Sequence, residues 1–544
     1  MKTRFLFCVL FAAVGLFSQE HVDWSYNSAL YEVNLRQYTS EGTFAAFREH
    51  LDRLQELGVS ILWFMPIHPI GEKNRLGRLG SYYSVRDYLD VNPEFGTLEE
   101  FKELVEELHS RGFYVLIDWV GNHTAWDNVL TVEHPEWYVH DDLGRFIAPP
   151  GTNWSDVIEL DYSQAELRRY MIDALKFWAL EVGVDGFRCD AVDMMPRDFW
   201  AQAIAELKAA KQSLFFLAEV DSRDWHDVGF DMTYAWGWYG FGSGVLKRVA
   251  DGKATAAEVN SYLLGEKSRF SGCYRLYFTA NHDENSWQGT TRELFGDAST
   301  LFWVLSATVP GMPLIYSGQE AGLDKRLKFF DKDEIEWRDH PDAEIFRTLL
   351  QLKRRCRALW NGSEGGSYQR VYTDNDRKIL AFLRSRDGDR LLVAANLTAE
   401  TQTLSFKGET ASGRWREVFS GDTLSVTAQT TVTLPAWGYR VYEGLTSDTG
   451  IKNGARPPSV EESWVRAFPN PFNSALVFQV GAANSAVIEL FDVRGRRVKR
   501  LQTNGGAIFW DARNENGEHV APGTYVYRVI HPGRRLQAKV VYLP

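Results

Sequence analysis

The chain has 544 residues, 44% of them hydrophobic and 24% charged, a composition that is typical of a folded globular protein with several domains. Its formal net charge of −12 argues against nucleic acid as a partner, because binding to nucleic acid needs a basic surface. Aromatic residues make up 14% of the chain, which fits large cores as well as rings that stack on sugars, so this number alone does not decide between the two.

The N-terminus predicts a secretory signal peptide over residues 1–18. Lys2 and Arg4 precede an apolar stretch that ends at Phe17, and the small Ser18 follows. This stretch is too short to cross a membrane as a helix, and no later segment is apolar for long enough, so we expect no transmembrane anchor. A buried N-terminal helix is the alternative to a signal peptide.

The cysteines predict neither a disulfide framework nor a zinc site. Loss of the signal peptide would leave Cys189, Cys273 and Cys356, an odd and widely spaced set. The sequence contains no CxxC or HExxH pattern.

Strand-like and helix-like segments alternate within residues 19–362, and this alternation predicts a parallel sheet. The eight predicted strands are 29–35, 60–66, 113–120, 184–190, 213–220, 230–236, 275–283 and 313–320. Helical segments follow nearly all of them, at 43–58, 98–112, 165–183, 197–211, 254–270, 299–309 and 342–356. Eight such units fit a closed (β/α)8 barrel, or TIM barrel. An open doubly wound sheet is the alternative, but no GxGxxG motif follows the first strand.

The connection after the third predicted strand, residues 120–160, is long, polar and rich in Trp, His, Asp and Pro. Long loops in compact domains usually have a function. Because this loop leaves the C-terminal end of a barrel strand, we expect a small inserted lobe beside the cleft.

The rest of the chain predicts two all-β domains joined by a linker. Residues 363–445 contain short alternating strands separated by turns, which favours a β-sandwich. Residues 446–463 are polar and rich in Gly, Pro and Ser, as expected of a linker. Residues 464–544 contain a further set of strands that fits a small Ig-like β-module.

Three carboxylates lie at the ends of predicted barrel strands: Asp190 in GVDGFRCD, Glu219 in SLFFLAE and Asp283 in RLYFTANHD. Barrels place their chemistry at this edge of the sheet. The three acids therefore predict an active site that is built on carboxylates.

The neighbours of two of these acids favour different roles. Arg188 lies two residues before Asp190, so both side chains face the same side of the strand. We expect its guanidinium to lower the pKa of Asp190 and keep it ionised, as a nucleophile requires; a structural ion pair is the alternative. Glu219 follows an apolar run, and burial there would raise its pKa, which suits a general acid.

Polar side chains accompany the acids at the same edge. Asp283 and His282 stand in NHDEN, which is also common turn chemistry. The third strand ends in VLIDWVGNH, from which Asp118, Asn122 and His123 leave together. A histidine at such a rim can hydrogen-bond a sugar hydroxyl, whereas a single isolated histidine would more often be structural.

Together these segments resemble glycoside hydrolase family 13, the α-amylase family. DWVGNH is similar to the first conserved region of that family, GFRCDAVDM to the second, LAEV to the third and TANHD to the fourth, in the family's order. The resemblance covers about residues 29–443, including the inserted lobe and the sandwich after the barrel. It implies a retaining mechanism on α-glucosidic bonds, through a covalent glycosyl-enzyme.

The resemblance also implies roles for single residues. Asp190 would be the nucleophile, Glu219 the acid/base and Asp283 the stabiliser of the transition state. The residues that would bind the same sugar are Tyr83, His123, Arg188 and His282. Tyr82 is the less favoured neighbour of Tyr83.

The chain departs from the family pattern after the nucleophile. Many members have Lys-His three and four residues after it, where this chain has Asp193 and Met194. That histidine can give a backbone carbonyl to calcium, so its replacement leaves Asn122 as the one recognisable candidate for a Ca²⁺ ligand. We expect no cofactor for the chemistry itself, and we hold Ca²⁺ as possible without assigning its ligand set.

The C-terminal module resembles the sorting domain of type IX secretion cargo, through FPNPFN, IELFDVRGRRV, WDARNENGEHVAPGTYVYRV and the final KVV. With the signal peptide, this implies a secreted or cell-surface protein that has the secretion machinery as a partner. A structural or carbohydrate-binding β-module is the alternative, in which Trp510, Tyr525 and Tyr527 would more often be core residues than a sugar platform.

These observations predict a secreted hydrolase of α-1,4-glucosidic bonds in starch-like α-glucans and maltooligosaccharides. A neopullulanase, a cyclomaltodextrinase or an α-glucan transferase would use the same carboxylates. A non-catalytic glucan-binding surface protein is the alternative from another class, although it would be expected to lose at least one of the three acids.

Overall fold

The computed structural model describes residues 21–240, 243–427 and 429–445, and in the C-terminal part residues 465–468, 476–480, 486–492, 494–503, 506–531 and 534–542. The chain forms two compact units, Met1–Asp448 and Thr449–Pro544. The predicted signal peptide and the predicted linker lie outside the described residues.

Eight parallel strands close into a barrel in the first unit, as the sequence predicts. They are β1 (Leu30–Val33), β2 (Ile61–Phe64), β3 (Tyr114–Trp119), β6 (Gly186–Cys189), β7 (Phe215–Ala218), β8 (Met232–Tyr234), β9 (Tyr274–Tyr277) and β10 (Met312–Tyr316). Their order around the barrel is β1-β10-β9-β8-β7-β6-β3-β2. Nearly every residue of these strands is buried, which explains why they appear in the sequence as continuous apolar runs.

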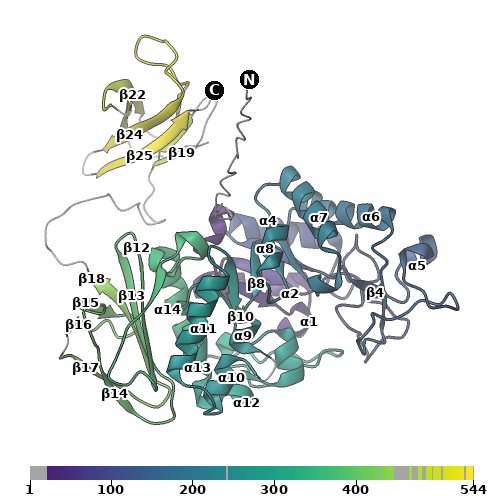
Figure 1. The fold of residues 1–544 in the computed structure, drawn as a ribbon. Helices are drawn as coiled ribbons and strands as arrows, with labels where there is room; N and C mark the ends of the chain where they lie inside the picture. The colour runs from purple at the N-terminus through teal and green to yellow at the C-terminus, as the bar shows by residue number, and fades with distance from the viewer. Residues whose placement is uncertain are drawn as a thin grey trace, which may run out of the picture. The chain divides into compact units, whose positions relative to one another are not determined.

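Helices cover the outside of the barrel (Figure 1). The helices of this unit are α1 (Leu35–Tyr38), α2 (Phe44–Arg48), α3 (Leu51–Leu57), α4 (Leu98–Ser110), α5 (Leu130–Glu133), α6 (Ala165–Lys176), α7 (Arg197–Ala210), α8 (Asp224–Val228), α9 (Trp236–Tyr239), α10 (Val245–Ala250), α11 (Ala256–Arg269), α12 (Thr291–Phe295), α13 (Ser299–Thr308) and α14 (Pro341–Arg355). Two predicted helices are divided: 43–58 forms α2 and α3, and 165–183 forms α6 and a π-helical turn, Phe177–Val182.

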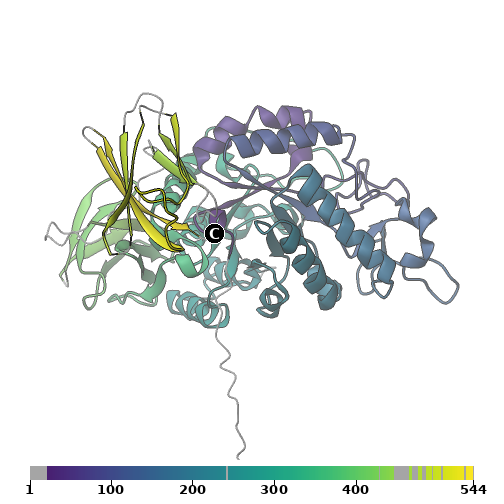
Figure 2. The ribbon, with the colours of Figure 1, turned by 90° about the horizontal axis from the view of Figure 1, so that it is seen from above.

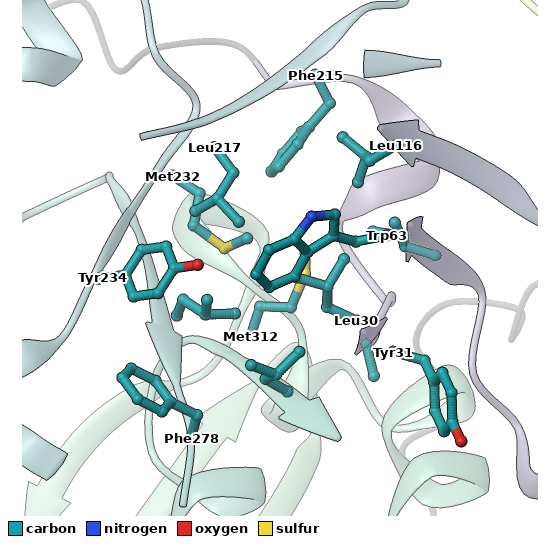
Figure 3. Packing of buried hydrophobic residues seen from close by; sticks show 14 of the residues in the cluster. Leu30, Tyr31, Trp63, Leu116, Phe215, Leu217, Met232, Tyr234, Phe278 and Met312 are labelled. Atoms are coloured by element: carbon teal, nitrogen blue, oxygen red, sulfur yellow. The ribbon is translucent and has the colours of Figure 1, made fainter. Parts of the chain in front are cut away.

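Side chains fill the interior of the barrel (Figure 3). The indole of Trp63, from β2, lies at the centre of this packing, close to Leu30 and Met312, and all three side chains are fully buried. Its Nε1 donates a hydrogen bond to Asp118 Oδ2 at 3.2 Å. The apolar interior therefore ends at a layer of buried polar groups, on which the candidate site rests.

The inserted lobe and the sandwich lie on opposite sides of the barrel (Figures 1 and 2). In the lobe, β4 (His123–Ala125) pairs antiparallel with β5 (Val157–Glu159). The sandwich strands are β11 (Ser367–Arg370), β12 (Ile379–Arg386), β13 (Asp389–Asn396), β14 (Gln402–Ser405), β15 (Gly413–Glu417), β16 (Thr423–Val426), β17 (Thr431–Leu434) and β18 (Tyr439–Leu445). They form a six-stranded sheet and a two-stranded ribbon around a common core that contains Trp415.

The second unit is all-β. Its described strands are β19 (Val465–Phe468), β20 (Leu476–Val480), β21 (Ala486–Phe491), β22 (Arg497–Thr503), β23 (Gly506–Trp510), β24 (Gly523–His531) and β25 (Arg534–Tyr542), in sheets of three and four strands. Trp510, Tyr525 and Tyr527 belong to its buried core, so they do not form a sugar platform. Among the described residues of the whole chain, no helix has the length and apolar character that a membrane span needs.

The barrel depends on close contact between β6 and β7 at Gly186. A Cβ at this position would lie 1.9 Å from the carbonyl oxygen of Phe215 and 2.8 Å from a methyl group of Leu116. We expect Gly186→Ala to lower the free energy of unfolding by at least about 2 kcal/mol, measured by urea denaturation, because the two strands would have to separate.

Gly265→Ala is the matched control, since Gly265 lies within α11 and a Cβ there meets nothing within 4 Å. It should be neutral or stabilising by up to about 1 kcal/mol. Equal unfolding free energies for the two variants would contradict the steric argument.

Candidate active site

The barrel brings the three predicted acids to one edge. Asp190 directly follows β6, Glu219 directly follows β7, and β6 and β7 are neighbouring parallel strands. Asp283 lies at the start of the short helical turn after β9. A cavity of about 440 Å³ opens over this edge, and Asp190 and Asp283 line it together with Tyr83 and His123.

One buried arginine joins the acids. Arg188 Nη1 donates to Asp190 Oδ1 at 2.9 Å and to Asp118 Oδ1 at 3.0 Å. Its Nη2 forms an ion pair with Glu219 Oε1 at 2.7 Å, and its Nε donates to Tyr234 Oη at 3.2 Å. The side chain of Arg188 is only 1% exposed, so the guanidinium lies beneath the carboxylates and holds them in fixed relative positions.

The backbone after Asp190 also holds Glu219. Ala191 has φ 42° and ψ 46°, a left-handed conformation that is rare for a residue with a side chain. In this conformation its N–H donates to Glu219 Oε2 at 3.0 Å. Glu219 is therefore held at both oxygens, and nothing in the sequence around Ala191 predicts this contact.

Burial changes the acidity of both carboxyls. It raises the pKa of Glu219 to about 7, although Arg188 lowers it, and this is the direction that the sequence predicts. Burial also raises the pKa of Asp190 to about 6, and Asp118 adds to the increase. The expected lowering of the Asp190 pKa is therefore wrong: Arg188 acts in that direction, but the loss of water and the nearby carboxylate outweigh it.

Tyr83 and His282 form the side of the site next to Asp283. The Tyr83 hydroxyl donates to Asp118 Oδ2 at 3.0 Å and lies 2.7 Å from His282 Nε2. His282 Nε2 is 3.4 Å from Asp283 Oδ2. Tyr82, in contrast, is buried outside the cavity and donates to Asn34 Oδ1.

His123 is buried against the lobe. Its ring centroid lies 5.1 Å from that of Trp154, and burial lowers its pKa to about 4, so the ring is neutral. A neutral imidazole can accept one hydrogen bond and donate another to sugar hydroxyls.

Two further buried acids belong to the site: Asp118, which the sequence places at this edge without a role, and Glu32, which the sequence analysis does not single out. Asp118 binds Arg188 and Tyr83, and Glu32 in β1 binds His282 Nδ1 through Oε1 at 2.5 Å. The one signal for Glu32 in the sequence is a single acid inside the apolar run ALYEVNL.

Aromatic side chains form the walls of the cavity. Trp154 of the lobe is 36% exposed and Trp287 is 52% exposed, and both line the cavity with Phe329 and Phe330. The Trp287 and Phe329 ring centroids are 5.3 Å apart. Exposed rings in a polar cleft are suited to stacking on the apolar faces of sugars.

Asn122 is the candidate calcium ligand from the sequence. Asn122 is buried, its Nδ2 lies 3.4 Å from His123 Nδ1, and Asp193 and Met194 are exposed. Within the described residues, no group of three or more His, Cys, Asp or Glu side chains could hold a metal ion. Calcium stays a possibility that the resemblance raises, and its ligands stay unassigned.

Three family profiles match separate parts of the chain. "Alpha amylase, catalytic domain" matches residues 26–136, "Maltogenic Amylase, C-terminal domain" matches residues 368–441, and "Secretion system C-terminal sorting domain" matches residues 466–542. The chain thus carries an amylase-type catalytic domain, the β-domain that follows it in maltogenic amylases and a type IX sorting domain.

Relatives and solved structures agree with these matches. Alpha-amylase 3 of Dictyoglomus thermophilum is 25% identical over 71% of this chain and 88% of its own length. The crystal structure of an alpha-amylase from Lactobacillus plantarum, 29% identical, superposes with a TM-score of 0.69 and covers 78% of this chain and 100% of that one. A maltogenic alpha-amylase of Thermotoga neapolitana, 28% identical, gives a TM-score of 0.70 over 77% and 99%.

The closed barrel, the order of its conserved segments and the similarity to amylases over most of both chains lead to one assignment. This chain has an amylase-type catalytic domain and is similar to glycoside hydrolases of the α-amylase family, glycoside hydrolase family 13, over most of its length.

Proposed function

We propose that this protein hydrolyses α-1,4-glucosidic bonds in starch-like α-glucans and maltooligosaccharides, with retention of the anomeric configuration. The observation that carries the proposal is the guanidinium of Arg188, which contacts both Asp190, a residue that lines the cavity, and Glu219 at the end of the neighbouring strand. Retaining hydrolysis needs two neighbouring carboxyls, one ionised as the nucleophile and one protonated as the acid.

Asp190 attacks the anomeric carbon with Oδ2, since Oδ1 accepts the hydrogen bond from Arg188. The C–O bond to the leaving sugar breaks as Glu219 donates its proton to the glycosidic oxygen, which gives a covalent glycosyl-enzyme. Glu219, now ionised, takes a proton from water, whose oxygen attacks the same carbon and releases Asp190. Asp283 stabilises the oxocarbenium-like transition state by accepting hydrogen bonds from sugar hydroxyls.

The remaining site residues bind and orient the sugar. Tyr83, His123 and His282 face the cavity or its edge, where they can contact the sugar at the point of cleavage. Arg188 is too deeply buried for broad contact with substrate, so we propose that it mainly positions the carboxylates. The proposed chemistry uses these side chains and no cofactor.

The pattern of products distinguishes the proposed activity from its alternatives. The exposed rings of Trp154 and Trp287 suit the faces of glucose units in a chain. A neopullulanase, a cyclomaltodextrinase or a transferase would use the same acids with differently shaped walls, and a glucan-binding protein would show no turnover.

We also propose that the protein acts outside the cell that makes it. The predicted signal peptide over residues 1–18 and the sorting domain at residues 466–542 support export to the medium or the cell surface through the secretion machinery.

The substrate class is tested by incubating the full chain with soluble starch, pullulan and cyclodextrins and resolving the products over time. We expect a mixture of oligosaccharides from starch at early times and little attack on pullulan. Faster cleavage of pullulan or cyclodextrins would favour the neopullulanase or cyclomaltodextrinase alternative, and absence of turnover on all three would favour the binding protein.

The roles of the two carboxyls are tested with Glu219→Gln and Asp190→Asn. We expect Glu219→Gln to lower kcat/KM on maltooligosaccharides by about 100- to 10,000-fold, with a smaller loss of kcat/KM on α-maltosyl fluoride, because fluoride leaves without a proton. Asp190→Asn should lose activity on both substrates, since the nucleophile is gone. In the parent, proton NMR should detect the α-anomer as the first product.

Glu266→Gln is the control for these variants, because Glu266 is also a buried acid but pairs with Arg275 away from the cavity. It should keep kcat on both substrates. A β-anomer as first product would rule out retention, and equal losses on both substrates in Glu219→Gln would rule out its role as the acid.

The pH dependence follows from the two raised pKa values. Asp190 must be ionised and Glu219 protonated, and their pKa values are raised to about 6 and about 7. We expect kcat/KM for maltooligosaccharides to be greatest between about pH 6 and 7, to fall below this range as Asp190 gains a proton, and to fall above it as Glu219 loses one. A profile that stays level to about pH 9 would contradict the assignment of Glu219.

A further inference from the structure

Glu32 is a carboxylate in the middle of barrel strand β1, and its exposed fraction is 0%. A charge in such a place costs free energy unless contacts compensate for it. Glu32 Oε1 lies 2.5 Å from His282 Nδ1 and accepts the backbone N–H of His282 at 3.3 Å. Its Oε2 has no hydrogen-bond partner within the described residues. The side-chain hydrogen bonds of this buried acid are thus directed to a single residue of the candidate site.

This contact determines which ring nitrogen of His282 faces the site. Because Nδ1 donates to Glu32, the other ring nitrogen, Nε2, is the one that faces the site, 2.7 Å from the Tyr83 hydroxyl and 3.4 Å from Asp283 Oδ2. Burial lowers the pKa of His282, but Asp283 and Glu32 together raise it to about 9. The ring is then an imidazolium at neutral pH, with a proton on both nitrogens.

The other groups around His282 do not replace Glu32. Arg188, from β6, acts against the positive ring. Asp118, from β3, binds the far side of the Tyr83 hydroxyl and is already paired with Arg188. The remaining titratable neighbour is Glu284, while Trp63 and Phe329 present rings at 6.0 and 6.4 Å.

We propose that Glu32 is a positioning residue that fixes the ring of His282 and keeps it in the imidazolium form, so that Nε2–H, which faces the Tyr83 oxygen, is shared with a sugar hydroxyl beside Asp283 when substrate binds. Glu32 itself does not reach the substrate. This inference rests on the proposed function, because it specifies how His282 binds the sugar during hydrolysis. The negative charge of Glu32 is the property that matters, since a neutral acceptor would hold the ring without stabilising its charge.

Glu32→Gln tests this distinction, because the amide oxygen can still accept from Nδ1 while the charge is removed. The substrate is α-maltosyl fluoride, which needs no proton from Glu219, so the titration of that acid does not obscure the alkaline range. We expect kcat/KM of the parent to stay level to about pH 8.5, and that of Glu32→Gln to be at least about tenfold lower there while remaining within about threefold of the parent near pH 6.

The titration of His282 gives a second readout that does not need turnover. In the full chain labelled at histidine with nitrogen-15, the His282 signals are identified by their loss in His282→Asn. We expect a titration midpoint near 9 in the parent, as the raised pKa implies, and below about 7 in Glu32→Gln. Glu32→Asp, which keeps the charge, should retain a midpoint well above that of Glu32→Gln and covers the case in which the amide variant does not fold.

Glu320→Gln is the matched control. Glu320 is likewise buried and accepts a hydrogen bond from Tyr31, the neighbour of Glu32 in β1. Its ion-pair partner is Arg53, outside the cavity. We expect this variant to lose stability and to keep the alkaline activity of the parent. The inference is overturned if Glu32→Gln has the His282 midpoint and the alkaline activity of the parent. If the parent does not turn over α-maltosyl fluoride, the proposed function is contradicted, whereas the titration still tests the role of Glu32.

Discussion

The guanidinium of Arg188 is the contact on which the rest of this site depends. It lies beneath three carboxylates, Asp118, Asp190 and Glu219, at distances of 3.0, 2.9 and 2.7 Å. Three buried carboxylates close together would repel one another strongly. The fixed positive charge of Arg188 between them offsets this repulsion. The rigid fork of arginine also sets their geometry, because each acid contacts a defined nitrogen of a planar group.

A single cation cannot neutralise three carboxylates, and this imbalance has chemical consequences. The pKa values of Asp118 and Asp190 are raised to about 6 and that of Glu219 to about 7, with burial as the largest cause in each case. The site therefore favours a state in which one proton stays among the acids near neutral pH. Glu219 has the highest pKa of the three, so it is the group that keeps the proton, as its proposed role requires.

A second buried ion pair supports the other half of the site. Glu32 holds His282 from below, and Tyr83 links His282 to Asp118, so the two ion pairs are connected through one hydroxyl. Strands of the barrel supply Glu32, Asp118 and Arg188, which are rigidly placed. Loops and the lobe supply Trp154, Trp287 and Phe329, which face the cavity. Because of this division, residues of the cavity wall can change without moving the charged residues that the strands hold.

The sequence by itself determined the barrel and the predicted acids at its edge. Strands buried on both faces must be apolar throughout, so each appears as a continuous run, and a carboxylate at the end of such a run is placed at the sheet edge by the chain itself. The positions of Asp190, Glu219 and Asp283 were predictable for this reason, and the order of the four motifs indicated the resemblance to the α-amylase family. The predicted boundaries of the domains and the roles of the site residues stay predictions.

Only the tertiary structure decided which groups meet across the strands and how much water they lose. Glu32 and His282 are distant in sequence, and no local pattern shows that they touch. The left-handed conformation of Ala191 and the contact between Trp287 and Phe329 in the cavity wall are likewise set by tertiary packing. The pKa of Asp190 was predicted in the wrong direction for the same reason. The neighbouring Arg188 is visible in the sequence, whereas the desolvation that outweighs it depends on every element packed around the site.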